Sequence, residues 1–131
     1  KLHAIYEHMY AKNIMIWHAF EYFSTFPKPA YAAMFKQMLS KPFDEKKIFE
    51  APSVNRTGAA LGLANLHDTS SVDLIITNSE HLRKSSDANC TEYLEALGML
   101  KGEKARAYIS SFINSKHAET RNYATALLKN W

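Results

Sequence analysis

The stretch RTGAALGLANL, residues 56–66, sets a pattern that recurs twice later in the chain. Counted from Arg56, the residues at offsets 3, 7 and 10 are apolar and share one face of an α-helix. CTEYLEALGML (90–100) and RNYATALLKNW (121–131) show the same offsets, and the starts lie 34 and 31 residues apart (90 − 56 and 121 − 90). That spacing is typical of stacked helical pairs. The nine positions are Ala59, Leu63, Leu66, Tyr93, Leu97, Leu100, Ala124, Leu128 and Trp131.

Composition favours one all-α domain. Of the 131 residues, 47% are apolar, which is enough for a core, and only four Gly and four Pro interrupt the chain. Eleven of the sixteen aromatic residues lie in residues 1–50. We therefore expect a divergent, aromatic-rich helical cap over residues 1–52 and clearer repeats over 53–131.

In the first half, residues 2–25 are expected to form one long helix, or two joined by a bend near Lys12–Asn13. Pro29 suits the first position of a second helix that runs to Leu39, and Asp44 could cap a short turn through Phe49. The inward stripe of residues 2–25 is predicted to be Leu2, Ile5, Met9, Ile16, Phe20 and Phe23.

In the second half, helices are expected at 53–66 and at 72–78, the latter despite the strand-like run Leu74–Thr77. The polar segment 79–87 is predicted to be a loop, or a loop that follows a last helical turn through Leu82. Lys101-Gly102 is a helix stop. The remaining predicted helices run from a cap at Ser86 or Asp87 to Leu100, from Glu103 to Asn114 with Ile113 inward, and from Glu119 to Trp131.

Residues 55–131 resemble HEAT-type repeats, in particular the short variety found in many bacterial proteins. The family pattern has Arg near the start of a helix, small residues one turn later and then Leu, as in Arg56, Ala59 and Leu63. The middle unit departs from it, because Cys90 replaces the Arg and Tyr93 the small residue. The resemblance implies an α-solenoid whose concave face binds other molecules.

No catalytic residue, metal site or cofactor is predicted, and we expect the protein not to be an enzyme. His3, His8 and His18 are five and ten residues apart, whereas a metal pair on a helix needs three or four. No glycine-rich phosphate loop occurs, and Ser110-Ser111 has no base nearby in sequence. Cys90 stands alone at a core position, which favours a buried, inert thiol.

The expected function is a protein–protein interaction module that uses the concave face of the stacked helices. A first alternative is nucleic-acid binding along a basic edge at the turns between helices, although the net charge of +3 is mild and acidic residues lie nearby. A second alternative is a bacterial inhibitor or immunity protein that binds one cognate toxin. The residues of the basic edge are Arg83, Lys84, Lys101, Lys104 and Arg106.

A soluble protein is expected; the compartment stays open, with the cytoplasm slightly favoured. The most apolar run, Ile14 to Phe26, is shorter than the roughly 20 residues of a membrane span. Because the first residue is Lys1 rather than Met, we expect a segment of a longer scaffold.

Overall fold

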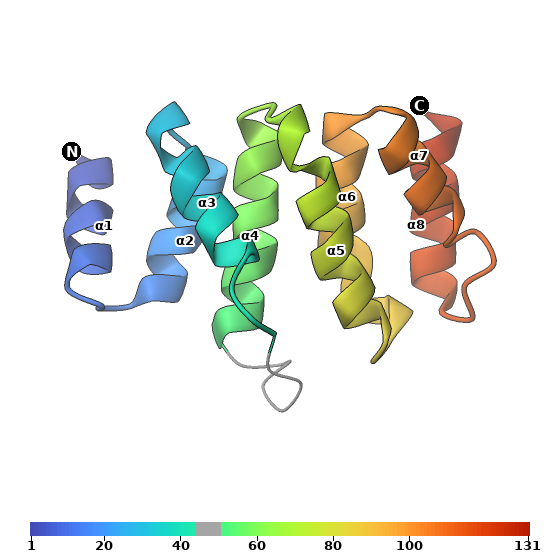
Figure 1. The fold of residues 1–131 in the computed structure, drawn as a ribbon, viewed down its shortest axis with the longest axis horizontal. Coiled ribbons are helices and arrows are strands. Elements are labelled where there is room, and N and C mark those ends of the chain that lie inside the picture. Colours follow the sequence, from blue (N-terminus) through green and yellow to red (C-terminus); the bar gives the residue numbers. More distant parts are fainter. Residues whose placement is uncertain (44–50) are drawn as a thin grey trace.

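The computed structural model describes residues 1–43 and 51–131, with side chains described from Asn55 onward in the second range. This part is built from α-helices and short 3₁₀ helices and contains no strand, which confirms the predicted all-α class (Figure 1). The predicted turn from Asp44 to Phe49 lies outside the described residues. None of the helices in the described ranges is both long and apolar enough to cross a membrane. The elements are α1 (Leu2–Ala11), α2 (Ile16–Thr25), η1 (Pro29–Tyr31), α3 (Ala32–Leu39), α4 (Ala51–Asn65), η3 (Thr69–Ser71), α5 (Val72–Arg83), η4 (Asp87–Cys90), α6 (Thr91–Leu100), α7 (Glu103–Ser110) and α8 (Ala118–Lys129).

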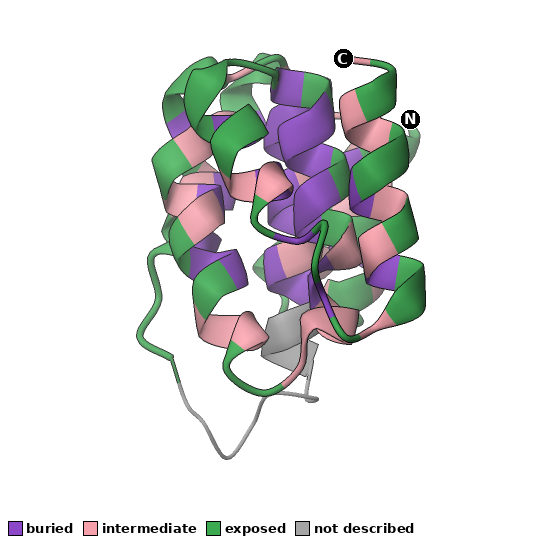
Figure 2. Cartoon of the chain, turned by 90° about the vertical axis from the view of Figure 1, so that its right-hand side faces the viewer, coloured by how far each residue is buried: buried purple, intermediate pink, exposed green. Residues whose placement is uncertain are grey.

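The helices lie in two rows. The first row consists of α2, α4, α6 and α8, in which each helix contacts the next, and the second row consists of α3, α5 and α7 in front of it (Figure 1). Helix α1 packs beside α2 at the amino-terminal end of the first row. Exposed positions lie on the outer sides of the helices (Figure 2). The chain therefore alternates between the rows from α2 to α8.

The repeated template marks the core, as its spacing predicts. Ala59, Leu63, Leu97 and Ala124 are fully buried, and Tyr93 is nearly so. The template positions near the ends of α4 and α8 are half-buried, because fewer helices cover them. Buried apolar surface at these positions is what holds one helical pair against the next.

Arg56 ties three helices together from a buried position on α4. Its Nη1 donates to the Leu39 carbonyl at 3.3 Å and to Asn78 Oδ1 at 3.1 Å. Its Nη2 donates to the carbonyls of Lys41 and Pro42 at 2.8 and 2.9 Å. Asn78, on α5, donates its Nδ2 to the same Leu39 carbonyl at 2.9 Å. The carbonyls that follow the last turn of α3, which no further helical N–H could satisfy, are thereby paired with α4 and α5.

The first residue of each template copy makes an equivalent contact. Cys90 Sγ lies 3.5 Å from the carbonyl of Ser79, near the end of α5, and donates to it. Arg121 Nη1 donates to the carbonyl of Ser115, beyond the end of α7, at 2.9 Å. The position therefore holds the end of α3 against α4, α5 against the chain before α6, and the turn after α7 against α8, even where Cys replaces Arg.

One predicted helix boundary is wrong, and a second is off by one residue. Helix α5 continues to Arg83, one residue beyond the last helical turn through Leu82 that the sequence allowed. The polar residue Ser79 is fully buried there, and the hydroxyl of Tyr108 donates to its Oγ at 2.8 Å. Helix α7 ends at Ser110 rather than at Asn114, and Ile113, expected inward, is 42% exposed in the turn that follows.

The inward stripe of the first helix is also wrong at its amino-terminal end. Residues 2–25 form two helices, with the break at residues 12–15. Leu2 and Ile5 are 55% and 54% exposed, whereas Phe20 and Phe23 are buried. The physical reason is that α2 packs on both α1 and α4, whereas the substantial contacts of α1 are with α2 alone among the described helices. The Lys101-Gly102 stop is confirmed, since both residues have a left-handed φ, of 66° and 96°.

A pair of glycine substitutions in α4 tests the close packing of α3 on α4. A Cβ at Gly62 would lie 2.5 Å from the ring of the fully buried Phe35, so Gly62→Ala is expected to destabilise the fold by about 1–3 kcal/mol. A Cβ at Gly58 would meet its nearest atom at 3.9 Å, so Gly58→Ala is expected to stabilise by roughly 0.5–1 kcal/mol through helix propensity. Urea unfolding measures both changes, and equal effects would contradict this packing.

Arginine-to-methionine substitutions test the anchors. Arg56→Met removes four hydrogen bonds and leaves acceptors at the end of α3 unpaired, so a loss of about 2–4 kcal/mol is expected. Arg121→Met removes one hydrogen bond from a half-buried side chain, so a loss of about 1 kcal/mol in the free energy of unfolding is expected. The free energy of unfolding from chemical denaturation compares the two. A loss at Arg56 no larger than that at Arg121 would show that the network does not hold α3.

Candidate functional site

The five predicted basic residues do not form one edge. Lys104, at the start of α7, pairs with Asp73 at 3.0 Å, near the first residue of α5. Arg83 is the last residue of α5, ten residues later (83 − 73), which corresponds to about 15 Å of helix. Arg83 and Lys84 therefore lie at one end of the helical pairs, whereas Lys101, Lys104 and Arg106 lie at the other.

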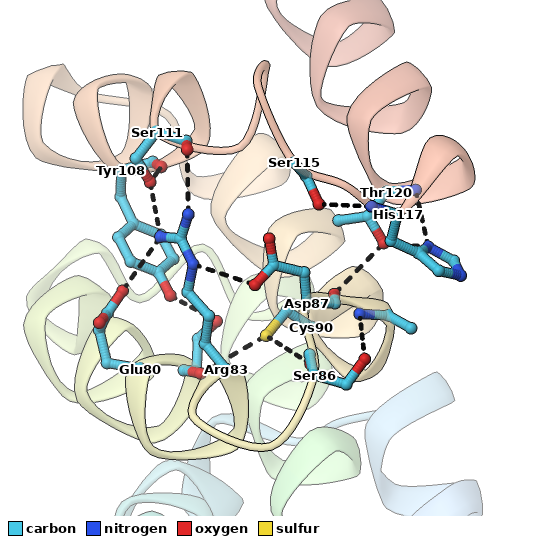
Figure 3. A network of polar contacts seen from close by, with 12 residues as sticks. Glu80, Arg83, Ser86, Asp87, Cys90, Tyr108, Ser111, Ser115, His117 and Thr120 are labelled. Atoms are coloured by element: carbon cyan, nitrogen blue, oxygen red, sulfur yellow. Dashed lines mark hydrogen bonds and ion pairs between the residues drawn. The ribbon is translucent and has the colours of Figure 1, made fainter.

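Arg83 is engaged in a structural network (Figure 3). Its guanidinium pairs with Glu80 and Asp87, both at 3.3 Å. It also donates to Ser111 Oγ at 2.8 Å and to the Ser111 carbonyl at 2.9 Å, and it lies 3.7 Å from the ring centroid of Phe112. Although burial opposes it, the carboxylates of Asp87 and Glu80 hold the pKa of Arg83 above its ordinary value. The charge is neutralised locally, and the side chain joins α5 to the turn after α7.

The same network reaches the start of α8. His117 caps that helix, because its Nδ1 accepts from the backbone N–H of Thr120 at 3.3 Å. Thr120 Oγ1 donates to the carbonyl of Asp87 at 3.2 Å. Ser115 Oγ accepts from the backbone N–H of His117 at 3.2 Å, so this serine faces the peptide of His117 and not its ring. The hydroxyl that does meet the His117 ring is that of Thr120, whose Oγ1 lies 2.9 Å from Nδ1; this hydroxyl is fully buried and forms part of the cap.

The remaining basic residues are partnered or dispersed. Lys101 Nζ lies 4.4 Å above the ring of Trp131, whose half-buried side chain follows α8. Lys104 and Asp73 form an exposed pair, and such pairs contribute little to stability. Lys84 and Arg106 are exposed. The structure thus leaves no concentrated positive surface among the residues that the sequence singles out.

A groove between α6 and α8 is the surface that sequence reasoning missed. It has a volume of about 430 Å³ and is lined by Thr91, Glu92, Glu95, Glu119 and Tyr123. The three glutamates are exposed, and none of them forms an ion pair with a residue that the structure describes. Burial raises the pKa of the half-buried Tyr123 hydroxyl, and the charges of Glu95 and Glu92 raise it further.

A local signal for half of this groove was present in the sequence. Glu92 and Glu95 are three residues apart, a spacing that places both on one face of a helix. Glu119 comes 24 residues after Glu95, and only the packing of α8 on α6 brings it to them.

Of the three histidines in α1 and α2, His3 is held by contacts with other parts of the chain. His3 Nε2 lies 2.7 Å from the carbonyl of Phe26, and its ring contacts those of Tyr22 and Tyr31. Over residues 1–43 and 51–131, no three His, Cys, Asp or Glu side chains gather closely enough to hold a metal ion. The described part therefore gives no support for metal chemistry at these histidines.

Comparison with known proteins finds no match to this chain among protein-family models, curated proteins or solved structures. The resemblance to HEAT repeats therefore stays a prediction that rests on the template residues and their spacing.

Cys90 is expected to be inert in the folded protein. Its side chain is fully buried, and burial raises the pKa of the thiol to about 11. Because the thiolate is the reactive form, alkylation by iodoacetamide at pH 8 should be about a hundredfold slower in the folded protein than in urea. Mass spectrometry of timed samples measures both rates. Equally fast labelling in the two states would contradict the buried position.

Proposed function

We propose that this chain is a HEAT-like α-solenoid, or a segment of one, and that it acts as a non-catalytic protein-binding module. Two features support the proposal. The helices alternate between two rows, and the first template residue of each unit joins successive rows through Arg56, Cys90 or Arg121. Stacked pairs of this kind present an extended face built from equivalent helices, which suits a peptide or a partner domain.

The groove between α6 and α8 indicates which kind of partner the module binds. Glu92, Glu95 and Glu119 present three carboxylates that no described basic side chain neutralises. A partner segment with Lys or Arg complements this charge, and its apolar stem can pack on the ring of Tyr123. The proposed partner is therefore a protein with a basic segment.

The same charges make nucleic acid a weaker candidate. A phosphate backbone would meet the carboxylates of the groove, while Arg83 and Lys104 already pair with acidic residues. An inhibitor or immunity protein is a special case of the proposal, in which a single toxin supplies the basic segment.

Affinity capture with the chain as bait tests the proposal. The wild-type protein is compared with the groove variant Glu92→Gln/Glu95→Gln and with the control variant Glu21→Gln/Glu103→Gln, which removes two exposed carboxylates elsewhere. At moderate salt, one dominant protein is expected, with about tenfold less of it on the groove variant and no change on the control. Mass spectrometry with labelled peptides measures the ratios.

Two results would contradict the proposal. Equal capture by the groove variant and the wild type would show that the groove is not the binding surface. Loss of all captured material after nuclease treatment would favour the nucleic-acid alternative.

A further inference from the structure

A cavity of about 580 Å³ lies at the opposite end of the molecule from the groove, where the α1–α2 loop meets the end of α3 and the start of α4. Apolar and aromatic side chains, among them Met15, Trp17 and Met38, make up most of its lining. Its polar lining consists of Asn13, Lys41 and Asn55. This size and this mixture of many apolar groups with a few polar ones are typical of small-molecule sites.

The loop holds apolar side chains out of the core. Asn13 and Met15 have left-handed φ angles of 59° and 47°, which non-glycine residues seldom adopt. The loop is nevertheless closed by hydrogen bonds, since the N–H of Ile14 donates to the Met9 carbonyl at 2.9 Å and that of His18 to the Met15 carbonyl at 3.0 Å. Met15 and Trp17 are thereby left about half exposed, at 51% and 47%. Apolar surface held in water by an ordered backbone gains from being covered.

Asn55 provides a second, independent observation at the same cavity. Its side chain is only 6% exposed, yet its Oδ1 accepts no hydrogen bond from any residue that the structure describes. Its neighbours Arg56 and Asn78 are by contrast fully engaged with one another and with backbone carbonyls. A buried amide oxygen without a donor is unfavourable and calls for a partner. Because the oxygen is almost fully covered, an N–H or O–H group of a bound molecule would reach it once the Asn55 side chain turns toward the cavity that it lines.

Lys41 adds a positive charge to the same cavity. Its backbone is held in place because its carbonyl accepts from Arg56 at 2.8 Å, while its side chain is exposed. Its ammonium forms no ion pair with a described residue. A carboxylate on the ligand is the natural complement.

From these observations we infer that the cavity binds a small aromatic carboxylate that carries a hydrogen-bond donor. The aromatic body lies against Trp17, Met15 and Met38, the carboxylate pairs with Lys41, and the donor meets the Asn55 amide. This inference is independent of the proposed protein-binding function, because the groove between α6 and α8 shares no residue with the cavity.

Titration with indole-3-acetate, followed by the two indole N–H signals in a nitrogen–proton NMR spectrum, tests the inference. The Trp17 signal is expected to shift saturably. The signal of Trp131, which follows α8 at the carboxyl-terminal end of the helix rows (Figure 1), serves as an internal reference. Two ligand analogues separate the polar contacts without any change to the protein. Indole-3-acetamide lacks the charge and 1-methylindole-3-acetate lacks the donor, and each is expected to bind about tenfold more weakly.

Protein variants test the same two polar contacts by changing the protein instead of the ligand. Lys41→Met should lower the affinity for indole-3-acetate about tenfold and make it equal to that for indole-3-acetamide. Asn55→Leu should lower the affinity for indole-3-acetate about tenfold and make it equal to that for 1-methylindole-3-acetate. Circular dichroism checks that this variant folds. Because Lys41 is exposed, its variant remains informative even where Asn55→Leu does not fold.

Three outcomes would overturn the inference. One is the absence of a saturable Trp17 shift up to about 5 mM ligand, because a specific site of this kind would bind more tightly than that concentration. Another is equal affinity for all three ligands, which would indicate nonspecific binding to an apolar surface rather than binding to a site with specific polar contacts. The third is a captured protein that protects Met15 and Trp17 from solvent while the small ligands fail to bind, which would make this corner a protein-docking surface.

Discussion

The buried guanidinium of Arg56 is the constraint on which much of the remaining structure depends. A charge in that position would be unfavourable without partners, and burial lowers the pKa of the group. Its hydrogen bonds to the Leu39, Lys41 and Pro42 carbonyls and to Asn78 offset this, and they fix the end of α3 against α4 and α5. The contacts of Cys90 and Arg121 are simpler versions of the same junction. One position in a repeated template thus sets how successive helices meet.

The anchor also shapes the surface beside it. Because Arg56 holds the carbonyls of Lys41 and Pro42 and lies 4.7 Å from the ring centroid of Phe43, the chain leaves α3 in one defined direction. That direction places Lys41 at the cavity that Asn55, the residue before Arg56, also lines. The contacts that stabilise the stack therefore also hold the polar groups of the inferred ligand site in place.

Charge is distributed differently in space and along the chain. Glu92 and Glu95 read in the sequence as local counter-charges to Lys101 and Lys104, which would leave a mixed and solvated surface. In the structure the glutamates line the groove toward α8, while Lys101 covers Trp131 and Lys104 pairs with Asp73. Arg83, predicted to lie on a basic edge, lies in a network that joins α5 to the turn after α7. The acidic groove thus emerges only when the helices are placed together.

Sequence by itself determined the helical class, the repeated core positions and several of the turns. Offsets of 3, 7 and 10 depend only on the helical period, Pro29 and Lys101-Gly102 act through their own backbone preferences, and both kinds of information are local. Tertiary structure alone decided that the polar Ser79 is fully buried within α5, where the hydroxyl of Tyr108 from α7 donates to it. It likewise decided that Leu2 and Ile5 remain exposed and that Asn55 is buried without a donor among the described residues. Whether a side chain is covered depends on elements distant in sequence, which periodicity and propensity do not encode.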